Sequence, residues 1–134
     1  MAQIFGTAVA RAAEAMMRAL GGSEIGLLLP IVLMPDDPGA QLGLVDPGVE
    51  EVRLSPVVIR NLPTESAGPR RRLEFLIPAT IVAAELRDRN VASAQALFGG
   101  ALGINYDNQL FHMESLQPEY FGGMAYLYRV MAVE

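Results

Sequence analysis

The residues best suited to chemistry in this sequence are one histidine and a few grouped carboxylates. His112 is the only histidine, and the chain has no cysteine. One copy therefore cannot build a zinc site from two histidines or from histidine and cysteine. Ser115 and Glu114 could in principle join His112 in a hydrolase triad, but side-chain alternation along a strand predicts His112 and Ser115 on opposite faces. We expect His112 to be an ordinary strand residue.

The grouped carboxylates lie beside proline or glycine and favour turns over metal or glycosidase sites. Asp36 and Asp37 precede Pro38 and Gly39, and the pair at residues 50–51 follows another Pro-Gly step. Asp, Pro and Gly are the usual residues of tight turns. The sequence contains no EF-hand pattern and no phosphate-binding glycine loop. We therefore predict no metal, no cofactor and no enzymatic activity.

The single basic cluster is Arg70, Arg71 and Arg72, at a predicted junction between a loop and a strand. Such a run of arginines is usually exposed to solvent without a dedicated role. If it has a function, we expect the arginines to form salt bridges to an acidic neighbouring subunit. All ten positive charges are arginines, and the formal net charge is −5. This balance disfavours a surface that tracks nucleic-acid phosphates.

Residues 3–20 are expected to form an amphipathic helix. Apolar residues recur there at helical spacing, and polar residues gather opposite. The pair Gly21-Gly22 supplies the backbone freedom that commonly ends a helix. The apolar face comprises Phe5, Ala8, Val9, Ala12, Met16 and Leu20.

Beyond the helix, short β runs with Gly and Pro turns dominate. Pro30 cannot donate to a ladder, so residues 24–34 are predicted to be an edge strand or one broken at a bulge, followed by a loop over residues 35–48. Residues 90–100 carry no clear period and stay unassigned, and a break is expected over 117–123. Further strands are expected at residues 51–54, 57–60, 73–77, 101–104, 110–116 and 124–133, with a brief helix beginning at Pro78.

These elements predict a mainly β fold with helical additions, namely a small antiparallel β-barrel or sandwich with an N-terminal α-helix and a short internal helix. A chain of 134 residues fits one domain. We expect a helical arm in residues 1–22 and a barrel with long loops in residues 23–134. No apolar run is long enough to cross a bilayer, and charges interrupt the stretch where a signal peptide would need its apolar region.

The composition indicates surfaces buried against partners. Apolar residues make up 51% of the chain, and the mean hydropathy is positive at +0.29. The final predicted strand carries bulky residues on both faces, which is typical of a central, buried strand. The candidate subunit-contact residues are Phe5, Val9, Ala12, Met16, Leu20, Leu28, Leu29, Asp36, Asp37, Leu44, Arg70, Arg71 and Arg72.

Two parts of the chain resemble the head-tail joining, or head-closure, proteins of tailed bacteriophages, in particular the small lambda-like joining proteins. Residues 5–14 followed by Leu20-Gly21 look like the opening helix of that family. Gly103-Ile104, Asn108-Gln109, residues 111–115, Pro118, Gly123 and residues 126–128 look like its closing hairpin and last strand. The resemblance covers about half of the chain, and residues 35–48 and 90–100 depart from it.

The resemblance implies a structural protein of the virion neck, synthesised in the host cytoplasm. Such a protein would form a sixfold or twelvefold ring that closes the packaged head and joins the portal or adaptor protein to the tail terminator or tail-tube protein. Packaged DNA would only pass through the channel, and no membrane would be involved. Ring stoichiometry and the loop that lines the channel stay open.

Two alternatives remain at this stage. A tail terminator or tail-completion protein would also form rings without catalytic residues. A small β-barrel that binds an apolar ligand would instead need an internal cavity, whereas a joining protein needs a filled barrel.

Overall fold

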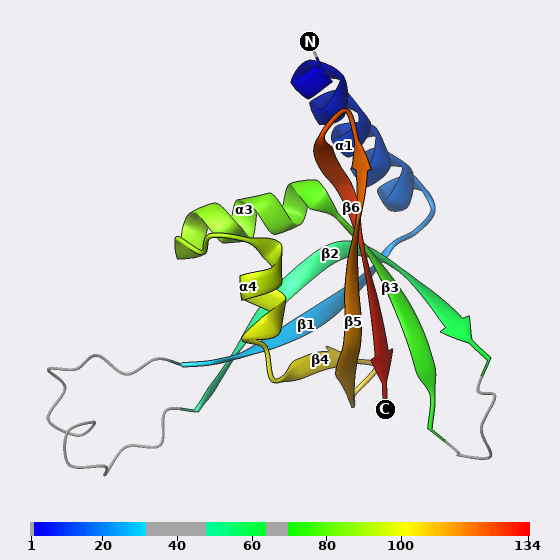
Figure 1. The fold of residues 1–134 in the computed structure, drawn as a ribbon. Coiled ribbons are helices and arrows are strands. Elements are labelled where there is room, and N and C mark those ends of the chain that lie inside the picture. The colour runs from blue at the N-terminus through cyan, green and yellow to red at the C-terminus, as the bar shows by residue number, and fades with distance from the viewer. Residues whose placement is uncertain (1, 32–47, 64–69) are drawn as a thin grey trace, which may run out of the picture.

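In the residues that it describes, the computed structural model of the chain is a closed, six-stranded antiparallel barrel with three helices (Figure 1). It describes residues 2–31, 48–63 and 70–134, and in residues 2–6 the backbone alone. The strand order is β1-β2-β3-β6-β5-β4. The strands are β1 (Ser23–Pro30), β2 (Val49–Leu62), β3 (Arg72–Pro78), β4 (Gly103–Tyr106), β5 (Gln109–Phe121) and β6 (Met124–Val133). The helices are α1 (Ala2–Ala19), α3 (Ala79–Arg89) and α4 (Ala94–Gly99). The predicted fold class is therefore confirmed.

Strand β2 is one continuous strand, so the predicted break at Ser55-Pro56 is wrong. Its first half pairs with β1 and its second half, from Val58, pairs with β3. The register to β1 shifts where two residues of β2 oppose one of β1, and Pro56, after a cis peptide bond, lies in that bulge. A bulge removes the need for a ladder hydrogen bond, which is why proline is tolerated there.

Strand β1 is not an edge strand, so the first of the two predicted alternatives is wrong; its ladder with β2 does contain a register shift, between Ser23 and Ile25. It pairs with β2 on one side and with β4 on the other, because the barrel is closed. Pro30 is its last residue, and the pairing to β4 already ends at Leu28. The proline therefore stands where no ladder bond from that side is required.

Strand β5 continues to Phe121, so the predicted break over residues 117–121 is also wrong. The chain turns only at Gly122-Gly123, both of which have positive φ. Among the described residues, β5 pairs with β4 only as far as Phe111, which leaves the edge around Pro118 without a neighbouring strand. A proline fits in a strand whose edge is open on the side of the missing amide hydrogen.

The unassigned segment 90–100 contains α4. Ser93 caps this helix by accepting a hydrogen bond of 3.1 Å from the amide of Ala96. The preceding α3 begins at Ala79, since Pro78 is still the last residue of β3, and it ends at Asn90 in the left-handed conformation. Both helices send buried side chains into the barrel, among them Val82, Leu97 and Phe98.

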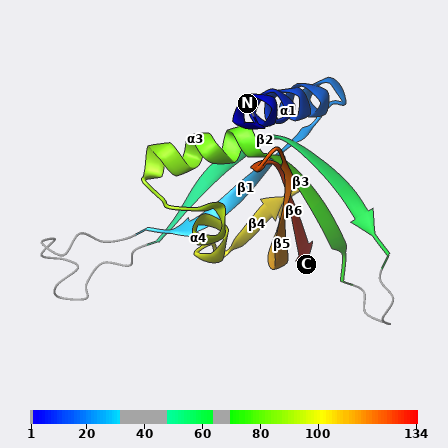
Figure 2. The same ribbon diagram turned by 45° about the horizontal axis from the view of Figure 1, so that its top comes forward.

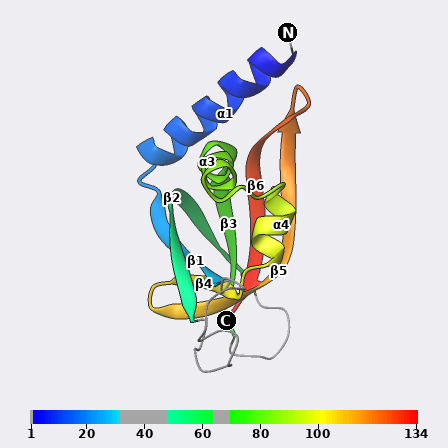
Figure 3. The same cartoon turned by 90° about the vertical axis from the view of Figure 1, so that its left-hand side faces the viewer.

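The barrel interior is filled by large side chains. Phe75 lies at its centre, with ring centroids 6.0 Å from Tyr106 and 6.1 Å from Phe111, both in edge-on geometry. From β6, Val130 and Ala132 point inward. Seen from above and from the side, α3 lies over one end of the strands and α1 crosses above it (Figures 2 and 3). The fold is thus a packed barrel with a helical cover.

Strand β6 is central, as its sequence predicts. It pairs with β3 on one side and with β5 on the other. Val130 is buried on the inner face, and Leu127 is buried on the outer face, where α1 and α3 pack against this strand. Because both faces of β6 are packed against other parts of the protein, bulky residues occur on both faces along the strand.

Candidate interaction surfaces

Helix α1 docks on the barrel through a face that differs from its predicted apolar face. Ala10 and Met17 are the buried side chains of the described part of this helix, and the helix packs mainly on β6, with smaller contacts to α3 and β2. They lie seven residues apart, about two helical turns, so they share one side of the helix. An alanine on that side lets the helix approach the strand closely. The predicted face is rotated away from this contact.

Part of the predicted apolar face of α1 therefore remains open. Met16 is 65% exposed and Leu20 is 72% exposed. Ala8 and Ala12 are exposed beside them, whereas Val9 is half-buried. Phe5 belongs to the helix, but its side chain lies outside the description. We define the outer face of α1 as Ala8, Ala12, Met16 and Leu20.

Apart from the arginines, the other subunit-contact residues predicted from the sequence do not gather on one described surface. Leu29 is buried in the barrel core, where the packing of the chain itself accounts for its hydrophobicity. Leu28 is half-buried on the outer side of β1, and its carbonyl accepts a hydrogen bond of 2.7 Å from the amide of Leu102. Asp36, Asp37 and Leu44 lie outside the described residues.

The three arginines have different environments. Arg72 makes two hydrogen bonds to Glu114, of 3.2 and 2.6 Å, across β6. Arg71 donates to Gln109 and lies 5.8 Å from the centroid of the Phe111 ring. Arg70 is exposed and has no ion pair among the described residues. Of the three, Arg72 is paired with a carboxylate, whereas the contacts of Arg71 described above are to a neutral amide and a ring.

His112 and Ser115 lie on the same side of β5, so the prediction of opposite faces is wrong. The register of β5 shifts between Met113 and Ser115, and this bulge resets the side-chain alternation. His112 and Ser115 are both exposed, but Glu114 is engaged by Arg72. In the described part of the chain, no group of three or more potential metal ligands is found.

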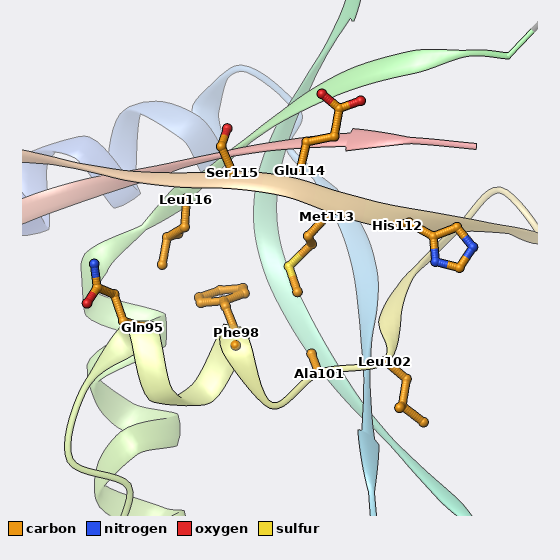
Figure 4. Close-up of a pocket in the computed structure, with 10 residues that line it drawn as sticks. Gln95, Phe98, Ala101, Leu102, His112, Met113, Glu114, Ser115 and Leu116 are labelled. Carbon is orange, nitrogen blue, oxygen red and sulfur yellow. The ribbon is translucent and has the colours of Figure 1, made fainter.

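A groove of about 450 Å³ runs between α4 and β5 (Figure 4). Its floor is formed by Phe98 from α4 and by Met113 and Leu116 from β5, which the bulge turns to the same side. Gln95 contributes a polar group to its rim, whereas the side chain of Ser115 points to the opposite face of β5 (Figure 4). A smaller cavity of about 250 Å³ lies near the turn from α1 to β1 and includes Arg71 and Tyr106. The first groove combines an apolar floor with a polar rim, the usual character of a recognition site.

The turn between β5 and β6 carries a second open surface that sequence analysis missed. This hairpin extends beyond the barrel next to α1 (Figures 1 and 3). Tyr120 is 65% exposed and Phe121 is 50% exposed. Thr7 of α1 lies 3.6 Å from the sulfur of Met124, which anchors the hairpin to the helix. In the sequence, the feature that could have indicated this surface is the aromatic pair directly before Gly122-Gly123.

An ion-pair network fastens α3 to the start of β2. Arg89 donates to both carboxylate oxygens of Glu50, at 2.6 and 3.1 Å, and also to Glu85. The hydrogen bonds and charge of Arg89 lower the pKa of Glu50 below its ordinary value. The hydrogen bond that Arg89 donates to Glu50 in turn raises the pKa of Arg89. This pair neutralises charge that would otherwise face solvent on the helical side.

Tyr128 gives the protein a predicted weakness at alkaline pH. Burial, and secondarily the nearby Tyr120, raise the pKa of Tyr128 above its ordinary value of 10.0. The phenol is neutral in both states below that pH, so its contribution to stability is fully present there. At higher pH the unfolded chain loses the proton first, and the free energy of unfolding falls. We expect urea unfolding of Tyr128→Phe to show a smaller loss between about pH 9 and about pH 11 than the wild type. An unchanged pH slope in Tyr128→Phe would contradict the assignment, and Tyr126→Phe serves as the matched control.

Comparison with known proteins finds no matching family model, no matching curated protein and no matching solved structure. No described helix has both the length and the apolar character needed to cross a membrane. The functional argument therefore rests on the surfaces of the molecule itself.

Proposed function

We propose that the chain is a structural protein of the bacteriophage neck that assembles into a ring, closes the packaged head and joins the portal or adaptor to the tail. The observation that carries this proposal is the open apolar outer face of α1. One face of this helix packs against the barrel, yet another face exposes Met16 and Leu20 to solvent. Grouped apolar exposure of this kind is typical of protein contact sites.

The filled barrel supports assembly over ligand binding. A barrel that holds a small apolar molecule needs internal space. Here the large side chains of Phe75, Phe111 and Phe98 are buried together in the core of the barrel. In this proposal the barrel acts as a rigid body that positions its surface elements. The resemblance of the N-terminal helix and the closing hairpin to joining proteins points to the same role.

The first test is the mass of the purified protein. Native mass measurement alone, with portal protein and with tail terminator protein should give a ring or a ring bound to its neighbour. Binding to the portal side identifies a joining protein, whereas binding only to the tail tube identifies a tail terminator or completion protein. The proposal would be refuted if the protein stays monomeric and binds none of the neck and tail proteins.

Methionine oxidation offers an internal test of the surface, because two adjacent methionines have opposite exposure. Met16 is 65% exposed and Met17 is 8% exposed. Peroxide converts accessible methionine to the sulfoxide, which mass spectrometry quantifies at each residue. In the free chain we expect Met16 to react faster than Met17. In the assembled particle the rate at Met16 should fall to that of Met17. Equal Met16 rates in free and assembled protein would exclude the outer face of α1 as a contact.

A further inference from the structure

The second half of β2 has an open edge. Residues 58–62 pair with β3 on one side, whereas the pairing of β2 with β1 ends at Val57, opposite Ser23. This half of β2 leaves β1 and runs beside β3 (Figure 1). In the described part of the chain, no other backbone hydrogen bond involves residues 58–62. A strand edge without a partner can accept a further strand.

This edge differs from the open edge of β5. The β5 edge contains a register shift after Met113 and also Pro118, which has no amide hydrogen. Bulges and prolines are features by which natural proteins prevent strand addition. Residues 58–62 contain neither a proline nor a register shift, and the bulge of β2 lies before Val57. Of these two open edges, that of β2 is therefore the one suited to a partner strand.

The cavity of about 250 Å³ lies along this edge. Its lining includes residues 57–59 and Asn61 of β2, together with Arg71 and Tyr106. We call this cavity the Arg71 pocket. Leu20, which belongs to the outer face of α1, also lines it. A partner that covers the outer face of α1 is therefore within reach of the pocket.

Arg71 brings a positive charge to this pocket without a carboxylate paired to it. Its guanidinium lies 5.8 Å from the centroid of the buried Phe111 ring and donates to the side-chain oxygen of Gln109 at 3.1 Å. Glu134 donates its backbone amide to the Arg71 carbonyl at 2.9 Å, but among the described residues Arg71 forms no ion pair. A guanidinium held over a ring keeps further N–H groups for a carboxylate.

We propose that the Arg71 pocket binds an extended acidic segment of a partner protein. The segment pairs with the open edge of β2 and places one aspartate or glutamate carboxylate on the Arg71 guanidinium. Main-chain hydrogen bonds along a strand edge supply affinity, and the side-chain contact supplies specificity. The inference goes beyond the neck proposal, because the site is defined on a single chain.

An extended segment fits the pocket better than a small free anion. Arg71 is the one charged side chain among the described residues that line it. A free anion would meet this single cation and leave the backbone groups of the β2 edge unpaired. A peptide carboxylate brings its own amide and carbonyl groups, which that edge can pair.

Selection from a library of random peptides tests the site on the full-length protein. The selected peptides should carry an aspartate or glutamate among β-branched residues. Arg71→Gln should weaken their binding at least about tenfold, the effect of losing one hydrogen-bonded charge pair. Arg71→Lys should weaken it less, because the charge remains. The matched control is Arg70→Gln, which removes the same charge from an exposed side chain outside the pocket lining and should leave binding unchanged.

Backbone pairing is tested on the selected peptides rather than on the protein. N-methylation removes an amide hydrogen and leaves the side chains as they are. Methylating one alternate set of amides should abolish binding, and methylating the other set should not, because every second amide of an edge strand faces its partner. Equal tolerance of both sets would refute the pairing with β2.

Two controls separate this site from folding and from the neck proposal. Arg71→Gln should keep the wild-type circular dichroism spectrum and melting temperature, since the side chain is exposed. Asn61→Trp, at a second exposed position, fills the pocket and should also block the peptides. The inference fails if no peptide is selected, if the selected peptides lack acidic residues, if they bind Arg71→Gln like the wild type, or if free acetate displaces them at an equal concentration. None of these results changes the ring expected in native mass measurement, so the two proposals fail separately.

Discussion

Phe75→Ala is expected to lower the free energy of unfolding by about 3–5 kcal/mol, the range for removing a large aromatic ring from a close-packed core. Phe75 is fully buried in β3 and touches Tyr106 and Phe111 edge-on. Its strand neighbours Ile59 and Val130 belong to β2 and β6, so the ring lies where three strands meet. The surrounding backbone is held in the closed barrel and cannot collapse into the space left behind.

Urea unfolding followed by circular dichroism measures this loss. Phe121→Ala removes the same ring from a half-exposed turn and should cost less than about 1 kcal/mol. Phe75→Leu should fall between the two, because it retains most of the buried volume. A loss below about 1.5 kcal/mol for Phe75→Ala would mean that the barrel interior is loosely packed. That result would also reopen the ligand-binding alternative, which depends on internal space.

Local sequence signals were sufficient for the elements whose limits depend on their own residues. The helical spacing of residues 3–20 and the glycines at 21 and 22 predicted α1 within one residue at each end. The apolar run at 124–133 predicted β6, and Gly122-Gly123 marked its hairpin turn. In these cases the stop signal and the periodic pattern lie within the element itself.

The sequence failed where a proline was tolerated for reasons supplied by other strands. Pro56 lies in a bulge opposite β1, and Pro118 lies on an edge that β4 does not reach. Pro30 ends β1 beyond the last residue paired to β4. Whether a missing amide matters depends on the neighbouring strand, which local sequence does not reveal. Each proline was therefore predicted to break or expose a strand that in fact belongs to a closed barrel.

The contact surfaces were predicted only in part for a related reason. The widest apolar stripe of α1 was recognised, but not that the helix would dock through Ala10 and Met17. Ala10 carries a weak hydrophobic signal, yet its small size allows close approach to β6. The α4–β5 groove depends on a six-residue helix and on a bulge in β5, neither of which has a periodic signature. Surfaces assembled from such short elements require the tertiary structure.

The double variant Met16→Glu with Leu20→Glu is expected to weaken assembly by about 1,000-fold while leaving the monomer folded. Two interface hot spots are worth about 2 kcal/mol each, and every 1.4 kcal/mol is about tenfold in affinity. Charging them places carboxylates in a contact that must exclude water, which carries a further cost. Both side chains are more than half exposed in the single chain, so its free energy of unfolding should change by less than about 0.5 kcal/mol.

Three comparisons make this result specific to the outer face of α1. Ala83→Glu with Ala92→Glu adds the same charge at exposed positions on and after α3 and should assemble normally. Met17→Glu should instead unfold or undock α1, because Met17 is buried against the barrel. Joined particles counted by electron microscopy, and native mass of the purified protein, measure assembly in each case. Normal head-tail joining by the Met16 and Leu20 double variant would show that assembly does not need the outer face of α1. The neck proposal would then lose the observation on which it depends.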